Sequence, residues 1–227
     1  MKFFCVTALF LSLVISTSAM AAFGLPEMPD IVKSIPGMGG APSDSADLDL
    51  DSLMDTQTEL VGKVSDALLA LSTSQTKMAE ALGLKEMAAI ATANAESLES
   101  GGLTGEDDME KQLSSTMSVN QTIQDKMESG VELDAAGKAK FAESLPFYGK
   151  GVYEMVTSAQ QASSTAQTVI ASKDLMAMNK LGTLLFVAKK SPSLLSGLYQ
   201  STDNIIDFAA SNGIDTSDLE SATDDWE

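Results

Sequence analysis

Histidine and arginine are absent from this chain of 227 residues, and its only cysteine is Cys5. Many enzymes use these side chains to hold zinc, to move protons, to attack carbonyl groups or to bind phosphate. Zinc sites built from Cys and His, Ser-His-Asp triads, Cys-His pairs and ferritin-type di-iron sites are therefore excluded. No P-loop or dinucleotide-binding glycine motif follows a strand pattern either. We therefore predict that the protein is not an enzyme and uses no metal or cofactor.

Positive charge is also scarce. All fourteen basic residues are lysines, and they stand against thirty-two acids, which gives a net charge of −18. Nucleic-acid binding depends on cations that displace counterions from phosphates, so we expect no nucleic-acid partner. Anionic membrane surfaces repel such a chain too, unless buried apolar area outweighs the repulsion.

The first 21 residues have the pattern of a cleavable export signal. A basic start at Lys2 precedes the apolar residues 3–15, and small residues follow up to Ala19-Met20-Ala21. We predict cleavage near Ala21 and a periplasmic or secreted protein. The mature chain would contain no cysteine, so packing alone must hold it together.

Composition favours helices. Ala, Leu, Met and Ser dominate, aromatic residues make up 5%, and β-branched residues form no alternating runs. We predict an all-α antiparallel helical bundle of about five to seven helices, whose lengths are compatible with an elongated form. The expected divisions are a signal peptide (1–21), an irregular Pro/Gly/Asp-rich arm (22–51), the bundle (52–213) and an acidic tail (214–227).

Glycine and proline set the expected helix boundaries. Stops are predicted at Gly83, Gly101, Gly130 and Gly213, a turn or kink at Pro146, and a new start at Ser191-Pro192. The resulting helices cover residues 52–82, 85–100, 105–129, 134–144, 147–171, 175–189 and 191–211.

In two of these helices, apolar residues recur at alternating steps of three and four residues, the spacing of coiled coils, and polar residues interrupt the resulting apolar seam. Gln75 lies in the seam of the first helix, and Thr116 and Asn120 lie in the seam of the third. Polar seam residues set register or partner choice at a cost in stability. They therefore favour a helical bundle that binds another protein or assembles into an oligomer.

Residues 175–208 are the most apolar part of the mature chain. We interpret them as buried core, and the alternative is a surface for lipid or membrane. The same choice concerns Phe147 and Tyr148, which suit a helix junction or an exposed contact point. The candidate surface residues are Leu181, Leu184, Leu185, Phe186, Leu194, Leu198, Phe147 and Tyr148.

Two short motifs carry little weight. Asp47, Asp49 and Asp51 resemble the start of an EF-hand loop, but the glycine and the final glutamate of that loop are missing. Ser74 and Lys77 match the S-x-x-K pattern of serine–lysine acyl enzymes, whose other motifs are absent. We interpret the first as a solvated acidic lead-in to a helix and the second as a helix surface.

The sequence therefore favours an exported, non-catalytic helical bundle that acts as a protein-interaction or structural component of the bacterial envelope. Its partner would be another envelope or secreted protein. The alternative is a carrier of lipid or acyl chains, or a membrane-active helical protein that resembles pore-forming proteins.

Overall fold

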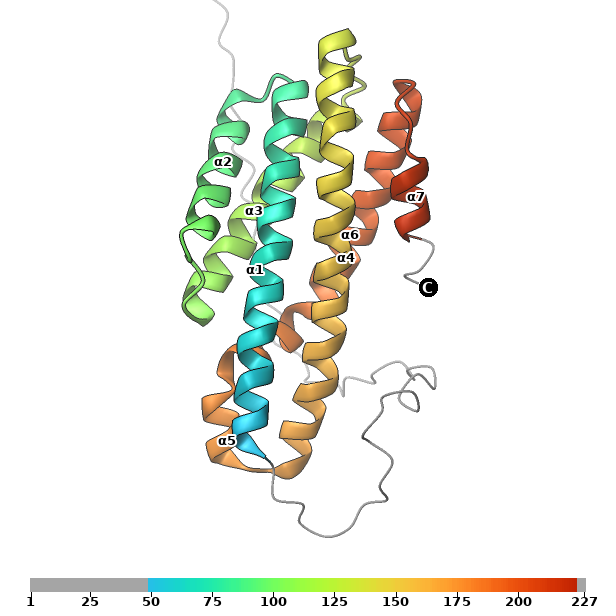
Figure 1. Ribbon diagram of the computed structural model, residues 1–227. Helices are drawn as coiled ribbons and strands as arrows, with labels where there is room; N and C mark the ends of the chain where they lie inside the picture. Colours follow the sequence, from blue (N-terminus) through green and yellow to red (C-terminus); the bar gives the residue numbers. More distant parts are fainter. Residues whose placement is uncertain (1–48, 224–227) are drawn as a thin grey trace, which may run out of the picture. The chain divides into compact units, whose positions relative to one another are not determined.

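A computed structural model describes residues 49–223, which form seven helices and no strand (Figure 1). This confirms the predicted all-α bundle. The predicted signal peptide, Asp47, most of the predicted arm and residues 224–227 lie outside the described part. The helices are α1 (Leu50–Ala81), α2 (Lys85–Glu99), α3 (Glu106–Glu128), α4 (Ala135–Ser172), α5 (Leu175–Lys180), α6 (Gly182–Ser211) and α7 (Ser217–Thr223).

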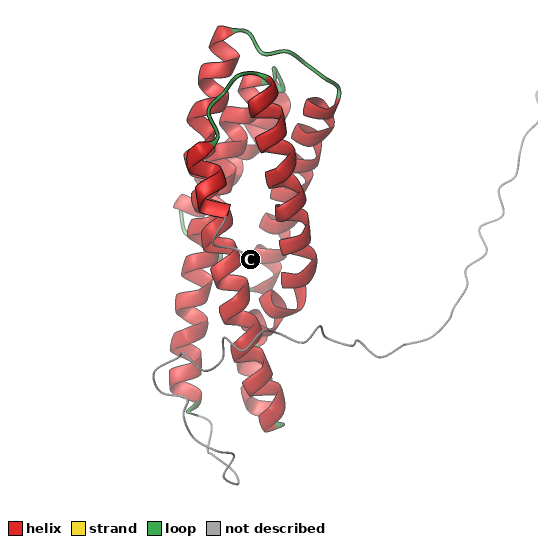
Figure 2. Cartoon of the chain, turned by 90° about the vertical axis from the view of Figure 1, so that its right-hand side faces the viewer, coloured by secondary structure: helices red, strands yellow, loops and turns green. Residues whose placement is uncertain are grey.

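Two long antiparallel helices, α1 and α4, organise the bundle. They have 32 and 38 residues, which correspond to about 48 and 57 Å at 1.5 Å per residue. In Figure 1, α2 lies on one side of this pair and α7 on the other, while α3 and α6, which contact each other, pass behind it. The view turned by 90° shows the same helices running lengthwise (Figure 2).

Small residues let α1 and α4 approach closely. A Cβ atom added to Gly151 of α4 would lie 2.7 Å from Cγ of Leu71 and 2.9 Å from the carbonyl oxygen of Ala67. Only glycine fits this contact, since real Cβ atoms do not come so near to other heavy atoms. The small residues of α4 therefore allow close packing against α1.

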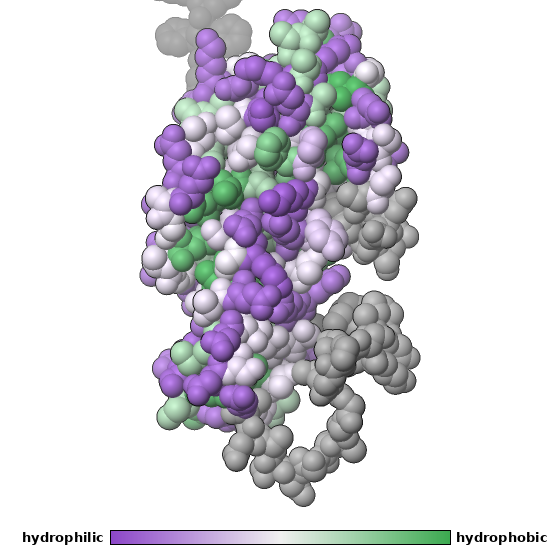
Figure 3. Space-filling view, in the orientation of Figure 1, coloured by the Kyte–Doolittle hydropathy of each residue, from purple (hydrophilic) through white to green (hydrophobic). Residues whose placement is uncertain are grey.

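The core is continuous along the bundle, and large side chains fill it. Among them, Phe141 of α4 lies 5.2 Å from Phe208 of α6 between ring centroids, in a tilted pair. The face seen in Figure 3 is mostly hydrophilic, and its apolar side chains form small separate patches. This division between interior and surface is what a helix with one apolar stripe produces on packing.

Most predicted helix ends are correct. Gly83, Gly101, Gly130 and Gly213 have φ angles between 70° and 82° directly after the helices that they end. This left-handed conformation is costly for residues with a Cβ atom, so it stops a helix where glycine stands.

The predicted turn at Pro146 is wrong, because α4 continues through this residue. Proline has no N–H group to donate to the carbonyl of Ala142, which weakens the helix locally. Buried side chains on both sides, Leu145 before and Val152 after, hold the two halves against the core. Tertiary packing therefore overrides the helix-breaking tendency.

The predicted start at Ser191-Pro192 is also wrong, since both residues lie inside α6. The Ser191 hydroxyl donates to the carbonyl oxygen of Val187 at 2.7 Å instead of capping a new helix. Such a bond to the preceding turn is a common role for serine within a helix.

The break that does occur lies ten residues earlier, and a side chain from α1 causes it. Gln57 donates through Nε2 to the carbonyl oxygen of Lys180 at 3.3 Å, and its Oε1 accepts from the backbone N–H of Leu184 at 3.1 Å. A continuous helix would pair these two backbone groups with each other. The Gln57 amide is inserted into that bond and separates α5 from α6, one of the known causes of helix kinks.

The segment expected as an acidic tail contains a further helix. Helix α7 packs on α4 with Leu219 buried. The Cδ1 atom of Leu219 lies 3.4 Å from where a Cβ of Gly149 would be, so the glycine leaves room for the leucine.

Candidate functional site

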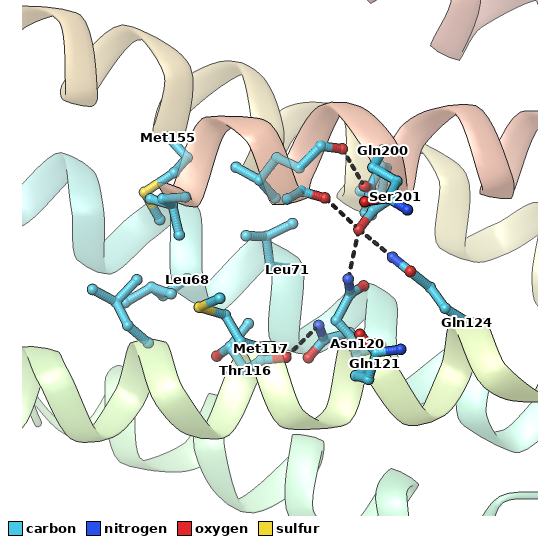
Figure 4. Close-up of a pocket in the computed structure, with 16 residues that line it drawn as sticks. Leu68, Leu71, Thr116, Met117, Asn120, Gln121, Gln124, Met155, Gln200 and Ser201 are labelled. Atoms are coloured by element: carbon cyan, nitrogen blue, oxygen red, sulfur yellow. Dashed lines mark hydrogen bonds between the residues drawn. The ribbon is translucent and has the colours of Figure 1, made fainter. Parts of the chain in front are cut away.

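The three polar seam residues identified in the sequence line one pocket. Gln75 from α1 and Thr116 and Asn120 from α3 face a cavity of about 120 Å³ that α4 and α6 complete. Figure 4 shows this pocket in close-up. Its apolar wall consists of Leu68, Leu71, Leu113, Met155, Leu194 and Leu198.

A hydrogen-bonded cluster closes one end of the pocket between α3 and α6. Asn120 donates through Nδ2 to Oγ of Ser201 at 2.7 Å, and Gln124 donates through Nε2 to the same oxygen. The Ser201 hydroxyl in turn donates to the carbonyl oxygen of Gly197 at 2.7 Å. In Figure 4 the Asn120, Gln124 and Ser201 side chains point toward one another. This end is therefore well satisfied.

Two buried polar atoms in the lining lack a partner. Gln75 donates through Nε2 to the carbonyl oxygen of Thr116 at 3.0 Å, but its Oε1 accepts no hydrogen bond. The Thr116 hydroxyl has no partner either. The two residues are only 2% and 5% exposed. Buried polar atoms are normally paired, and these two are among seven such side-chain atoms without a partner in the described residues.

The lining carries no charged side chain. Its one ionisable group is the Tyr148 phenol, which lies near Thr202 Oγ1 at 3.2 Å. Burial raises the pKa of Tyr148 far above its ordinary value, and the hydrogen bond between Tyr148 and Thr202 opposes this only in part. The phenol therefore stays neutral at physiological pH, and so does the whole pocket.

A second hollow continues along the groove between α3 and α6. It shares Leu113, Met117 and Leu194 with the pocket and has a volume of about 410 Å³. Lys190 of α6 crosses this groove and pairs with Glu110 of α3 at 3.2 Å. Since the two side chains are 43% and 59% exposed, this ion pair contributes little to stability.

Most of the residues proposed as a surface are buried, as the core interpretation predicts. Leu181, Leu184, Phe186, Leu194 and Tyr148 belong to the core. Leu185 and Leu198 are half-buried, and Phe147 is exposed, with the Lys77 ammonium 5.8 Å from its ring centroid. Because Phe147 and Tyr148 lie inside continuous α4, they form no helix junction.

The sequence analysis did not identify the most exposed apolar cluster. Leu175, Met176 and Ile170, at the turn between α4 and α5, are 80%, 63% and 55% exposed. We call these three side chains the apolar end. The sequence did contain a signal for this turn, the polar run Ser172-Lys173-Asp174. Asp174 caps the start of α5 and so places the turn directly before Leu175 and Met176.

The structure describes Asp49 and Asp51 of the first short motif and both residues of the second. Ser74 is buried, while the Lys77 ammonium binds Glu143 on the surface at 3.1 Å. Asp49 caps α1 by accepting from the N–H of Ser52. Within residues 49–223, no three acidic side chains cluster as metal ligands would.

None of the helices that the structure describes is both long enough and apolar enough to cross a bilayer. Comparison with family models, curated protein sequences and solved structures gives no match to this chain.

Proposed function

We propose that this protein is an exported, non-catalytic helical bundle that binds another protein of the bacterial envelope or the secreted fraction. The apolar end supports this proposal. Leu175, Met176 and Ile170 are exposed within seven residues of one another, at the end of α4 and the start of α5. Exposed apolar side chains at a capped helix turn are a suitable anchor for a partner's pocket.

The energy available from this contact is moderate. Fully burying a side chain of this kind contributes about 1.5–3 kcal/mol. Scaled by the exposed fractions of the three side chains, the contact would contribute roughly 3–6 kcal/mol. A micromolar complex needs about 8 kcal/mol. The partner must therefore make further contacts around the apolar end.

Charge indicates what those contacts are. The net charge is −18, and the acidic start of α1, with Asp49, Asp51 and Asp55, lies beside α5 (Figure 1). A partner with an apolar pocket bordered by lysine or arginine complements this end. An anionic membrane surface is repelled by the same charge.

The carrier alternative receives less support. The pocket of about 120 Å³, which opens to the surface, is smaller than the cavity of about 150 Å³ that holds one benzene molecule. A long acyl chain does not fit inside this pocket and would have to extend into the open hollow of about 410 Å³ beside it.

Site-specific photo-crosslinking tests the proposal. A photoreactive amino acid replaces Leu175 in one version and Ile90, an exposed apolar residue of α2, in the control version. We expect a discrete crosslinked protein from position 175 only. After purification of that protein, the double variant Leu175→Ser/Met176→Ser should bind it about tenfold more weakly or worse, while Ile90→Ser should bind normally.

Flotation with neutral and anionic liposomes distinguishes binding to a membrane from binding to a protein partner. If the chain co-floats and the double variant does not, a membrane surface replaces the protein partner. If neither crosslinking nor flotation depends on the apolar end, the proposed function is refuted.

A further inference from the structure

We propose that the exposed face of the second half of α4 is a contact surface for a second copy of this chain, which packs against it in the antiparallel direction. The inference does not depend on the partner proposed for the apolar end. It rests on the charge of this face, on the spacing of its residues and on their match to a reversed copy. We call the face the α4 stripe, and its six exposed residues are Tyr153, Thr157, Gln160, Ser164, Gln167 and Ala171.

Charge distinguishes the α4 stripe from the rest of the surface. Residues 155–172 contain no Asp, Glu, Lys or Arg, and no other uncharged run within residues 49–223 is as long. Between Glu154 and Asp203 the single acidic residue is Asp174, although the whole chain contains thirty-two acids. The net charge of −18 keeps two copies apart wherever acids face each other. A second copy can therefore approach best at a face without acids, and such a face offers a basic partner no charge to pair with.

The spacing of the α4 stripe suits packing against another helix. Its residues follow one another at alternating steps of four and three. Positions with this spacing form a straight seam along one side of a helix, as they do in a coiled coil. From Tyr153 to Ala171 the seam is about 27 Å long at 1.5 Å per residue. A second helix can thus lie along it for several turns.

A reversed copy matches the α4 stripe in side-chain size. In an antiparallel pair centred on residue 162, residues equally far before and after this position lie opposite each other. Each contact then joins a larger side chain of one copy to a smaller one of the other, which lets the two surfaces interlock. A parallel pair would place every side chain opposite itself, with tyrosine against tyrosine. The antiparallel pairs are Tyr153 with Ala171, Gln160 with Ser164, and Gln167 with Thr157.

The polar groups of these pairs are complementary as well. The hydroxyls of Thr157 and Ser164 donate to backbone carbonyl oxygens of the preceding turn at 2.9 and 3.0 Å. Each hydroxyl oxygen keeps lone pairs that accept a further hydrogen bond. The side-chain amides of Gln160 and Gln167 have no partner within the described residues. In the antiparallel pair, each amide lies opposite a hydroxyl of the second copy and can donate to it.

Charged residues at the two ends of the uncharged run favour the same direction. Lys150 and Glu154 lie before it, 3.8 Å apart, while Lys173 and Asp174 follow it. Reversal brings the first pair of one copy beside the second pair of the other. Each end then contains charges of both signs from both copies, so opposite charges can pair across the contact. In a parallel dimer, each lysine would face the same lysine.

The contact is small and symmetric. It involves fewer residues than the roughly 20–30 that each partner contributes to a standard interface. We therefore expect a weak dimer at high concentration and monomers in dilute samples, such as those used to follow unfolding. Because both copies use the same face about a two-fold axis, the assembly closes at two chains and does not extend into a fibre.

Sedimentation velocity tests the proposal on the chain without its predicted signal peptide, from micromolar to millimolar concentration. We expect a dimer to form across this range. Ser164→Glu places two acids near the two-fold axis and should weaken dimerisation about tenfold or more. Ser118→Glu adds the same charge at an exposed position of α3 and should leave dimerisation unchanged. The double variant Gln160→Lys/Ser164→Glu should restore the dimer, because each new lysine lies opposite a new glutamate of the second copy.

Disulfide formation measures the direction of the two helices. The chain has no cysteine after Cys5, so a single introduced cysteine reports on one position. In a mixture of Gln160→Cys and Ser164→Cys held in a glutathione redox buffer, disulfides should join the two different variants in preference to two copies of the same one.

Three results would each overturn the proposal. The first is a chain that stays monomeric up to millimolar concentration. The second is a dimer that Ser164→Glu weakens no more than Ser118→Glu does, which would place the contact elsewhere. The third is a preference for disulfides between copies of the same cysteine variant, which would indicate parallel helices. Circular dichroism of each variant checks that the fold is retained.

Discussion

Replacing Gln75 by leucine should make the protein more stable. The substitution removes Oε1, a buried acceptor without a partner, whose loss of hydration costs about 1–3 kcal/mol. It also removes the bond from Nε2 to the Thr116 carbonyl, which is worth about 0.5–1.5 kcal/mol. That carbonyl lies inside α3 and keeps its helical partner, so the change leaves no new unpaired group.

The expected net gain in unfolding free energy is about 1 kcal/mol, because leucine has a similar volume and adds apolar contact with Leu71 and Leu113 at the wall. For a domain of this size, 1 kcal/mol corresponds to a rise in Tm of about 2–4 °C. Thermal unfolding followed by circular dichroism at 222 nm, together with urea unfolding, measures the change. The matched control is Gln160→Leu at an exposed position of α4, where we expect a change within about 0.5 kcal/mol.

A Gln75→Leu variant that is equally stable or less stable would refute this reasoning. It would mean that Oε1 already has a partner in solution, such as water held in the pocket. Light scattering on the same samples tests the role expected from the coiled-coil seam. If Gln75 selects an oligomeric state, the variant should change its assembly as well as its Tm.

Three further substitutions test other parts of the fold. Gly151→Ala should lower stability by about 1–3 kcal/mol through overpacking against α1. Gly62→Ala, with open space around it, should instead raise stability by about 0.5–1 kcal/mol. If the two variants change the free energy of urea unfolding equally, the close contact at Gly151 is contradicted. Burial raises the pKa of Tyr148 in the native state. The native phenol therefore stays neutral at a pH where the unfolded one ionises, which is near pH 10. Stability is consequently lost as the pH rises above about 10. The wild-type protein should lose up to about 1.4 kcal/mol per pH unit more than Tyr148→Phe in that range, and parallel pH curves would show that the phenol is accessible. Asp134→Ala removes the cap that accepts from the N–H of Gly137 at 2.7 Å and should cost about 1 kcal/mol; unchanged urea midpoints would show that the cap contributes nothing.

Local signals predicted much of the fold. The helix-stopping glycines and the three-and-four spacing of apolar residues depend only on neighbours along the chain, and the structure places both as expected. Pro146 and Ser191-Pro192 were misread for the opposite reason. These residues do favour a helix break locally. However, buried side chains next to them, such as Leu145 and Leu194, pack against other helices, and this packing keeps each helix continuous.

The site was predictable only in pieces. The positions of Gln75, Thr116 and Asn120 in apolar seams identified them as unusual, since a seam of a helical bundle is normally apolar. Their convergence on one pocket depends on the relative register of α1 and α3, which sequence spacing does not give. The role of Ser201 and the exposure of Leu175 depend on packing between helices for the same reason.

The insertion of Gln57 between α5 and α6 has a consequence for the direction of the apolar end. Without that amide, the backbone groups of Lys180 and Leu184 can pair with each other and join α5 to α6 as one straight helix. The two arrangements exchange two hydrogen bonds to a side chain for one within the helix, a difference of about 1 kcal/mol. The direction of α5 is thus set from α1, more than a hundred residues away in sequence, and the burial of Ala177 and Leu181 at the same junction holds it there.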